Sequence, residues 1–168
     1  METLPSQMPF APVYDADCRV LVLGSHPSVA SKRQGFYDMH PQNRFWRVMG
    51  ALFGEDFVSA DAQGKRALLL GHHVALYDVV YACDIAGSSD ASIRHVTPCD
   101  LRAILATCPI ERIYLNGGTA YRLFCRFHPD LADVAQCLPS TSAANARCAL
   151  GDLVTAWQGV KTHAEGGK

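Results

Sequence analysis

The sequence lacks the features that mark several large protein classes. No apolar run approaches the roughly 20 residues that a membrane span needs, and the residues before Arg19 lack the basic-then-apolar layout of a secretion signal. The seven cysteines include no Cys-x-x-Cys pair, which argues against a zinc site, an iron–sulfur cluster or a disulfide framework. These observations predict a cytoplasmic protein that needs no metal or other cofactor.

Charge of one sign is also lacking. The formal net charge is −1, so the surface as a whole does not attract polyanions, and any nucleic-acid binding must use a local basic patch. Lys32, Arg33, Arg44 and Arg47 cluster in the sequence around the stretch GFYDMHPQNRFW. They are candidates for such a patch, and they are equally suited to solvate the ends of loops and helices.

The size and composition favour one domain with a well-filled core. The chain has 168 residues, of which 49% are apolar and 18% are charged, a balance that is unlike that of disordered chains. We expect an N-terminal arm over residues 1–18, a single domain over residues 19–160 and a flexible tail over residues 161–168. No internal repeat or interdomain linker interrupts the domain.

Apolar runs alternate with helical patterns along the domain. RVLVL (19–23) is a short apolar run closed by Gly24, as expected for a buried parallel strand. Further strands are predicted in 73–80, 110–116 and 134–138, and helices in 43–53, 61–72, 97–108, 119–127 and 144–160. Asn43 is placed to cap the first helix, and Thr97 with Pro98 to begin the third. The pattern predicts an α/β fold, a three-layer α/β/α arrangement with a central four-stranded, mainly parallel sheet.

Three polar loops follow the predicted strands, and in open α/β sheets ligands bind at this edge. They are Gly24–Ser28, Asn116–Gly118 and Leu138–Asn145. None of them carries a carboxylate, and the chain has no nucleophile elbow, phosphate loop or dinucleotide fingerprint. What remains is amides, hydroxyls, one histidine and nearby aromatic rings, which suits the recognition of a flat, hydrogen-bonding heterocycle.

These residues match a known family. GSHPS, HPQNRFW, NGG and LPSTSAAN together resemble the uracil-DNA glycosylase superfamily, specifically its hypoxanthine (deoxyinosine) branch, over about Arg19 to Trp157. The resemblance implies a monofunctional DNA glycosylase that flips out a deaminated base and hydrolyses its N-glycosidic bond. Uracil-specific relatives carry an activating Asp or Asn where this chain has His26, and often a histidine where it has Leu138. The hypoxanthine branch lacks both groups, so excision of hypoxanthine in base excision repair is the expected activity.

The resemblance also assigns roles to individual residues. It implies Asn43 and Asn116 as the catalytic pair, with Asn43 orienting water or the departing base and Asn116 reading the base edge. Gly24, Ser25, His26 and Phe45 are expected to bind the base, with the Phe45 ring stacked on it. The residues expected to contact DNA are Pro27, Ser28, Arg44, Ser140, Thr141 and Ser142.

Other interpretations stay open. Asn43 could serve only as a helix cap, Asn116 as a turn residue, Phe45 as part of the core and His26 as a proton donor or a space filler. HPQNRFW is also similar to the mismatch-specific uracil/thymine glycosylases, and a pocket that reads a modified base without cleaving it is the alternative of another class. The expected partner is DNA with deaminated bases, bound by a cytoplasmic monomer of bacterial type acting at the nucleoid, without a membrane.

Overall fold

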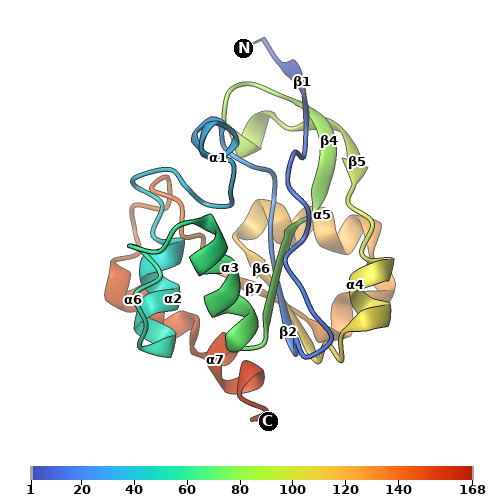
Figure 1. Cartoon of the computed structure of the whole chain (residues 1–168). Helices are drawn as coiled ribbons and strands as arrows, with labels where there is room; N and C mark the ends of the chain where they lie inside the picture. The colour runs from blue at the N-terminus through green and yellow to red at the C-terminus, as the bar shows by residue number, and fades with distance from the viewer. Residues whose placement is uncertain (1, 168) are drawn as a thin grey trace.

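A four-stranded sheet forms the centre of the molecule in the computed structural model, which describes residues 2–167. Its strands lie in the order β3-β2-β6-β7, and every neighbouring pair is parallel (Figure 1). The strand bounds are Val20–Gly24 for β2, Val74–Asp78 for β3, Arg112–Asn116 for β6 and Ala135–Leu138 for β7. The predicted α/β class and four-stranded sheet are confirmed.

The central position of β2 follows from its composition. Val20 to Leu23 are fully buried, which requires protein on both faces of the strand and on both edges. Val22 pairs with Leu76 of β3 on one edge and with Tyr114 of β6 on the other. All four carboxyl ends therefore point to the same end of the molecule, and the loops that follow them meet there.

Helices cover both faces of this sheet, which confirms the three layers. In Figure 1, α2, α3, α6 and α7 gather on one side of the sheet and α4 and α5 on the other. The helix bounds are Val29–Gln34 for α1, Phe45–Phe53 for α2, Ala62–Gly71 for α3, Arg102–Thr107 for α4, Gly118–Phe127 for α5, Leu150–Ala156 for α6 and Gln158–Ala164 for α7. Within residues 2–167, no helix has the length and apolar character to cross a membrane.

A second, antiparallel sheet was not foreseen. It has the order β1-β4-β5, with bounds Leu4–Gln7, Val80–Ile85 and Arg94–Pro98. The predicted helix start at Thr97 and Pro98 is wrong, because both residues belong to β5 and pair with β4. The helix α4 begins at Arg102, whose N–H donates to the Asp100 carboxylate at 3.0 Å. Short 3₁₀ turns cover Asp90–Ser92 (η1) and Pro129–Val134 (η2).

The two ends of the chain differ from expectation. The arm contributes β1 to the small sheet, and α7 continues to the buried Ala164, beyond the start of the expected tail. The predicted closing helix over 144–160 is wrong in its first part, since residues 142–149 form a loop. The Arg44 guanidinium donates to the carbonyls of Ser142, Asn145 and Cys148, and a helix over 144–160 would need the last two of these carbonyls for its own hydrogen bonds.

Candidate functional site

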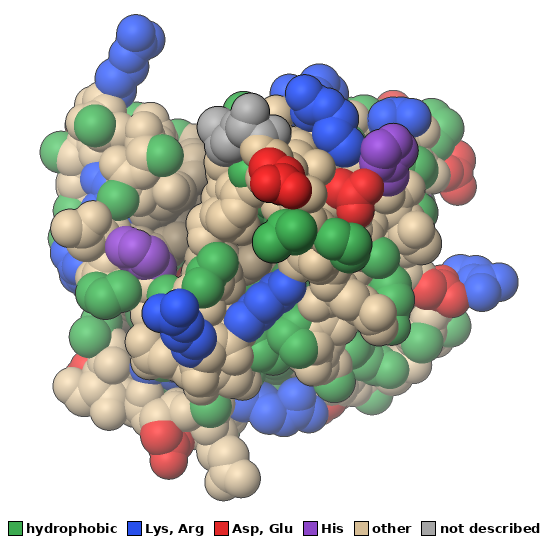
Figure 2. Space-filling model, turned by 90° about the horizontal axis from the view of Figure 1, so that it is seen from above, with side chains coloured by type: hydrophobic (Ala, Val, Ile, Leu, Met, Phe, Trp, Pro, Cys, Tyr) green, Lys and Arg blue, Asp and Glu red, His purple; other side chains and the backbone are tan. Residues whose placement is uncertain are grey.

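The loops after the parallel strands border one large cleft. Its volume is about 1090 Å³, enough for a nucleotide-sized ligand. Ten of the twelve residues predicted for the site line it, the exceptions being Phe45 and Arg44. Figure 2 looks onto this end of the molecule and shows a hollowed face, with Lys and Arg side chains spread over it and not gathered in one patch.

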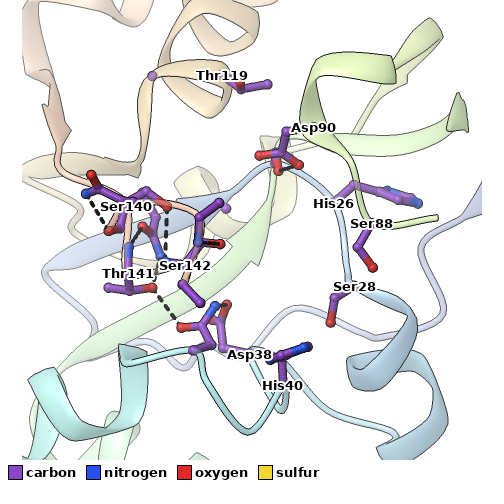
Figure 3. Close-up of a pocket in the computed structure, with 18 of the residues that line it drawn as sticks. His26, Ser28, Asp38, His40, Ser88, Asp90, Thr119, Ser140, Thr141 and Ser142 are labelled. Atoms are coloured by element: carbon purple, nitrogen blue, oxygen red, sulfur yellow. Dashed lines mark hydrogen bonds between the residues drawn. The ribbon is translucent and has the colours of Figure 1, made fainter. Parts of the chain in front are cut away.

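Two asparagines from distant segments are joined across the cleft by Thr141. The Thr141 hydroxyl donates to Asn43 Oδ1 at 2.9 Å and accepts from Asn116 Nδ2 at 3.0 Å, and the Thr141 N–H donates to Asn116 Oδ1 at 3.0 Å (Figure 3). Asn43 Oδ1 also accepts the N–H of Phe45 at 2.9 Å. Because a backbone N–H can only donate, these bonds fix which end of each amide is the oxygen.

This network changes the role expected of two residues. Thr141 is fully buried and its hydroxyl is used by the two amides, so the prediction that it contacts DNA is wrong. The helix cap predicted at Asn43 is off by one residue: Arg44 is the N-cap residue of α2, and its side chain makes no capping hydrogen bond. Asn43 Oδ1 accepts the N–H of Phe45, the first helical residue. Asn43 therefore both supports the start of the helix and lines the cleft.

The prediction that Phe45 stacks on a base is wrong. Its ring is fully buried and meets Trp46 and Trp157 edge-on, with ring centroids at 4.8 Å and 5.9 Å. The residue lies on the apolar face of α2 that also buries Val48 and Leu52, and hydrophobic packing there outcompetes a position on the cleft. Tyr37 is an aromatic residue that lines the cleft, and sequence reasoning missed it.

His26 is held by both ring nitrogens. Nδ1 lies 2.9 Å from the Val80 carbonyl and must donate to it, so in the neutral ring Nε2 accepts the Ser6 hydroxyl, also at 2.9 Å. Burial lowers the His26 pKa, an effect that the bond to the Val80 carbonyl opposes and the nearby Lys32 charge reinforces. His26 thus ties β1 and β4 to the first loop as a neutral ring, an arrangement that does not favour proton donation.

Three carboxyl groups line the cleft, although the predicted loops contain none. Asp78 ends β3 and is buried, and burial together with the Asp38 and Asp90 charges holds its pKa well above the usual range. Burial also raises the pKa of Asp38 to about 7. Asp90 lies on the rim, where burial raises its pKa and the Ser25 hydroxyl, donating at 2.8 Å, opposes that shift.

The local sequence gives little indication that these three carboxyl groups line the cleft. Asp78 is the last residue of β3, whose carboxyl end lies at the predicted edge of the site, so its position was the one usable signal. Gly24 fits this arrangement because a Cβ there would come within 2.6 Å of Asp78 Oδ1. Asp38 lies in a loop before α2, and Asp90 begins η1, which connects β4 and β5 of the unforeseen second sheet, so only the fold brings either to the cleft.

Comparison with known proteins identifies the family. A model described as the uracil DNA glycosylase superfamily matches residues 11–159. The chain belongs to this superfamily. A hypoxanthine DNA glycosylase from Methanosarcina acetivorans is 30% identical over 92% of this chain and 97% of its own length. A second, from Methanosarcina barkeri, is 38% identical over 51% of this chain and 54% of its own length.

The architecture agrees with that assignment. The chain is similar to a solution NMR structure from Methanosarcina acetivorans described as a candidate uracil DNA glycosylase, with a TM-score of 0.78 and 26% identity over 94% of this chain and 99% of that one. The glycosylases of the two Methanosarcina species are archaeal relatives, so these similarities give no support to the expected bacterial type.

The other residues expected to contact DNA are not equally free to do so in this superfamily member. Arg44 is turned inward onto three carbonyls of the loop before α6, so the prediction that it contacts DNA is not supported. Ser28 caps α1 by accepting the Ser31 N–H at 3.1 Å, and Ser140 accepts the Ser142 N–H at 3.1 Å. Pro27, Ser28, Ser140 and Ser142 all line the cleft, and Arg147 is the basic residue among its lining.

Proposed function

We propose that this protein is a monofunctional hypoxanthine DNA glycosylase, which flips a deaminated base out of DNA and hydrolyses its N-glycosidic bond to leave an abasic site. One observation carries the proposal: the two asparagines bridged by Thr141 face a nucleotide-sized cleft in a chain that matches a hypoxanthine DNA glycosylase along nearly its whole length. The product enters base excision repair.

Asn116 suits the recognition of hypoxanthine. One hydrogen of its Nδ2 and one lone pair of its Oδ1 bind Thr141, which leaves one donor and one acceptor for a ligand. The lactam edge of hypoxanthine presents the complementary pair, an N–H beside a carbonyl oxygen. A base without this edge would leave the amide unpaired in the cleft, at a cost of ~1–3 kcal/mol.

Asn43 acts where the bond breaks. Its Oδ1 is occupied by the Phe45 N–H and the Thr141 hydroxyl, so only the Nδ2 hydrogens are available to a water or a departing base. A donor that is held in place before the reaction can stabilise developing negative charge on the leaving base, by about 3–4 kcal/mol in related donor sites. An oxocarbenium-like sugar then accepts water.

The proposal also covers how the protein binds DNA and where in the cell it acts. Gly24, Ser25 and His26 border the base-binding part of the cleft, while Pro27, Ser28, Ser140 and Ser142 border its mouth, where backbone N–H groups and hydroxyls can meet phosphates. We propose that the protein acts on cellular DNA in the cytoplasm as a monomer that flips one nucleotide.

The test is single-turnover incubation with duplex DNA carrying hypoxanthine, uracil or no lesion, followed by alkaline cleavage at abasic sites. Wild type is compared with Asn43→Ala and Asn116→Ala, whose folding is checked by circular dichroism. We expect cleavage at hypoxanthine that both folded variants lose. Cleavage at uracil alone would indicate the mismatch-specific uracil/thymine branch, and binding without any cleavage would indicate a reader of modified bases.

A further inference from the structure

The proposed hydrolysis needs a group that takes a proton from water, and the three carboxyl groups on the cleft differ in their fitness for this. Asp78 is 6% exposed and lies against Gly24, and Asp90 already accepts the Ser25 hydroxyl at 2.8 Å. Asp38 is half-buried and lines the cleft. Within residues 2–167 its side chain makes one hydrogen-bond contact, a long one of 3.5 Å from Asn43 Nδ2.

That long contact suits a bridging water. Charge-assisted N–H···O bonds measure about 2.7–2.9 Å, so Asn43 and Asp38 face each other without closing a strong bond. A water molecule beside them would accept from Asn43 Nδ2 and donate to an Asp38 oxygen. It would keep a lone pair for the sugar carbon. Figure 3 shows Asp38 beside the end of the bond that Thr141 makes to Asn43.

The backbone fixes Asp38 in this position. Its φ angle is +52°, in the left-handed region that few residues other than glycine adopt. The neighbours on both sides are anchored: the Tyr37 carbonyl accepts the Trp46 indole N–H at 3.0 Å, and the Met39 N–H donates to the Ser31 hydroxyl at 3.1 Å. Residues keep such conformations where several surrounding contacts hold them in place, and these conformations concentrate at functional sites.

We propose that Asp38 is the general base of the reaction, accepting a proton from the water that Asn43 Nδ2 orients. This assignment rests on the proposed glycosylase function. The C1′–N9 bond breaks and its electron pair leaves with the base, while the water oxygen bonds to C1′ and one water proton moves to Asp38. The departing base gains one proton, either directly from Asp38 or from solvent while Asp38 releases its own proton to solvent, so base and sugar leave as neutral products and Asp38 returns to its ionised form.

Burial sets the pH at which Asp38 can act. The titratable and charged groups that share the cleft with it come from its own loop and from five other segments. They are Tyr37 and His40 from its own loop, Asp78 from β3, Asp90 from η1, His26 from the first loop, Cys137 from β7, and Arg147 and Cys148 from the loop before α6. Burial raises the Asp38 pKa to about 7. A base must be ionised to act, so the excision rate should rise with pH through about 7 and then level off.

The experiment measures single-turnover excision from hypoxanthine-containing duplex DNA between pH 5.5 and 9 for wild type, Asp38→Asn and the control Asp133→Asn. Asparagine has the same shape and tolerates a left-handed φ, so the first variant should fold. Asp133 is exposed on η2 and lies off the cleft. We expect Asp38→Asn to lose ~100-fold or more at pH 8 and to lose the rising limb. Asp133→Asn should match wild type.

DNA affinity separates a catalytic role from a structural one. We expect Asp38→Asn to bind hypoxanthine DNA with a Kd within about threefold of wild type while its excision rate falls. A folded Asp38→Asn variant with a near-wild-type rate and pH profile would overturn the assignment. So would a wild-type rate that falls through pH 7, since that sign belongs to an acid, or a rate and affinity that fall together.

The assignment and the proposed function can fail separately. If wild type excises uracil and not hypoxanthine, the proposed function fails, and the same comparison on uracil DNA still decides the role of Asp38. If wild type excises hypoxanthine and Asp38→Asn does so equally well, the function stands and the assignment fails. A wild type that excises neither base overturns both.

Discussion

Replacing Thr141 by valine tests the network at the centre of the cleft. Valine has nearly the same shape as threonine and lacks only the hydroxyl, which donates to Asn43 Oδ1 at 2.9 Å and accepts from Asn116 Nδ2 at 3.0 Å. The Thr141 backbone bond to Asn116 Oδ1 is unaffected. The substitution therefore removes two hydrogen bonds from a fully buried side chain and little else.

The size of the effect follows from these two bonds. Each contributes a net ~0.5–1.5 kcal/mol, so the free energy of unfolding should fall by about 1–3 kcal/mol. For a chain of this length the melting temperature should drop by roughly 2–12 °C. Both amides also lose a constraint on their orientation, and misplacement by about 1 Å can cost 10²-fold in rate. We expect single-turnover excision to fall ~10–100-fold.

The matched control is Thr141→Ser, which keeps the hydroxyl and loses a buried methyl group. Its free energy of unfolding should also fall, by about the value of one buried methylene, ~0.8 kcal/mol. Its excision rate should stay within about threefold of wild type. Thermal unfolding and single-turnover excision of both variants check the reasoning, and a folded Thr141→Val protein with the wild-type rate would refute it.

Two further substitutions test residues whose expected roles the structure changed. His26→Phe should lower the free energy of unfolding by ~1–3 kcal/mol, because the hydrogen bonds of His26 to Val80 and Ser6 are lost. Its excision rate should stay within about threefold of wild type. A large loss of rate would indicate that His26 has a catalytic role. Because burial lowers the His26 pKa, the folded wild type binds fewer protons than the unfolded chain at acid pH. The difference in melting temperature between wild type and His26→Phe should therefore shrink as pH falls below 6.5. Arg44→Met should speed hydrogen exchange in the loop 142–148, since three of its carbonyls lose a charged donor. The control Arg47→Met removes an exposed bond to the Pro41 carbonyl and should leave exchange in that loop unchanged. Equal exchange rates in the two variants would contradict the view that Arg44 holds the loop in place.

Much of the fold could be predicted because its signals are local. VLVL (20–23) is apolar at every position, as expected for a strand buried on both faces, and it forms most of β2. Asp61 caps α3 by accepting the Gly64 N–H at 2.8 Å, at the start of the segment 61–72 in which a helix was predicted. β5 escaped prediction because Thr97 and Pro98 carry good helix-start chemistry, and pairing with β4 overrides it.

The candidate site could also be predicted only where its signals are local. The three loops could be placed together because parallel strands end at one edge of a sheet, and Asn43 and Asn116 line the cleft there. The surroundings of Phe45 could not be settled, since helical spacing makes it equally a core residue. Asp38 and Asp90 were missed because a carboxylate in a loop has no sequence signal of burial, and their raised pKa values arise from the protein around them.

By itself the sequence determined the class of fold, the edge of the sheet that bears the site and the family to which the chain belongs, because strand hydrophobicity and short motifs are properties of neighbouring residues. The tertiary structure alone decided that Thr141 orients both asparagines, that Arg44 faces inward and that Asp38 meets Asn43. Thr141 lies 98 positions from Asn43 in the chain. Contacts over such separations depend on how layers pack, and hydrogen bonds and burial then set the chemistry of each group.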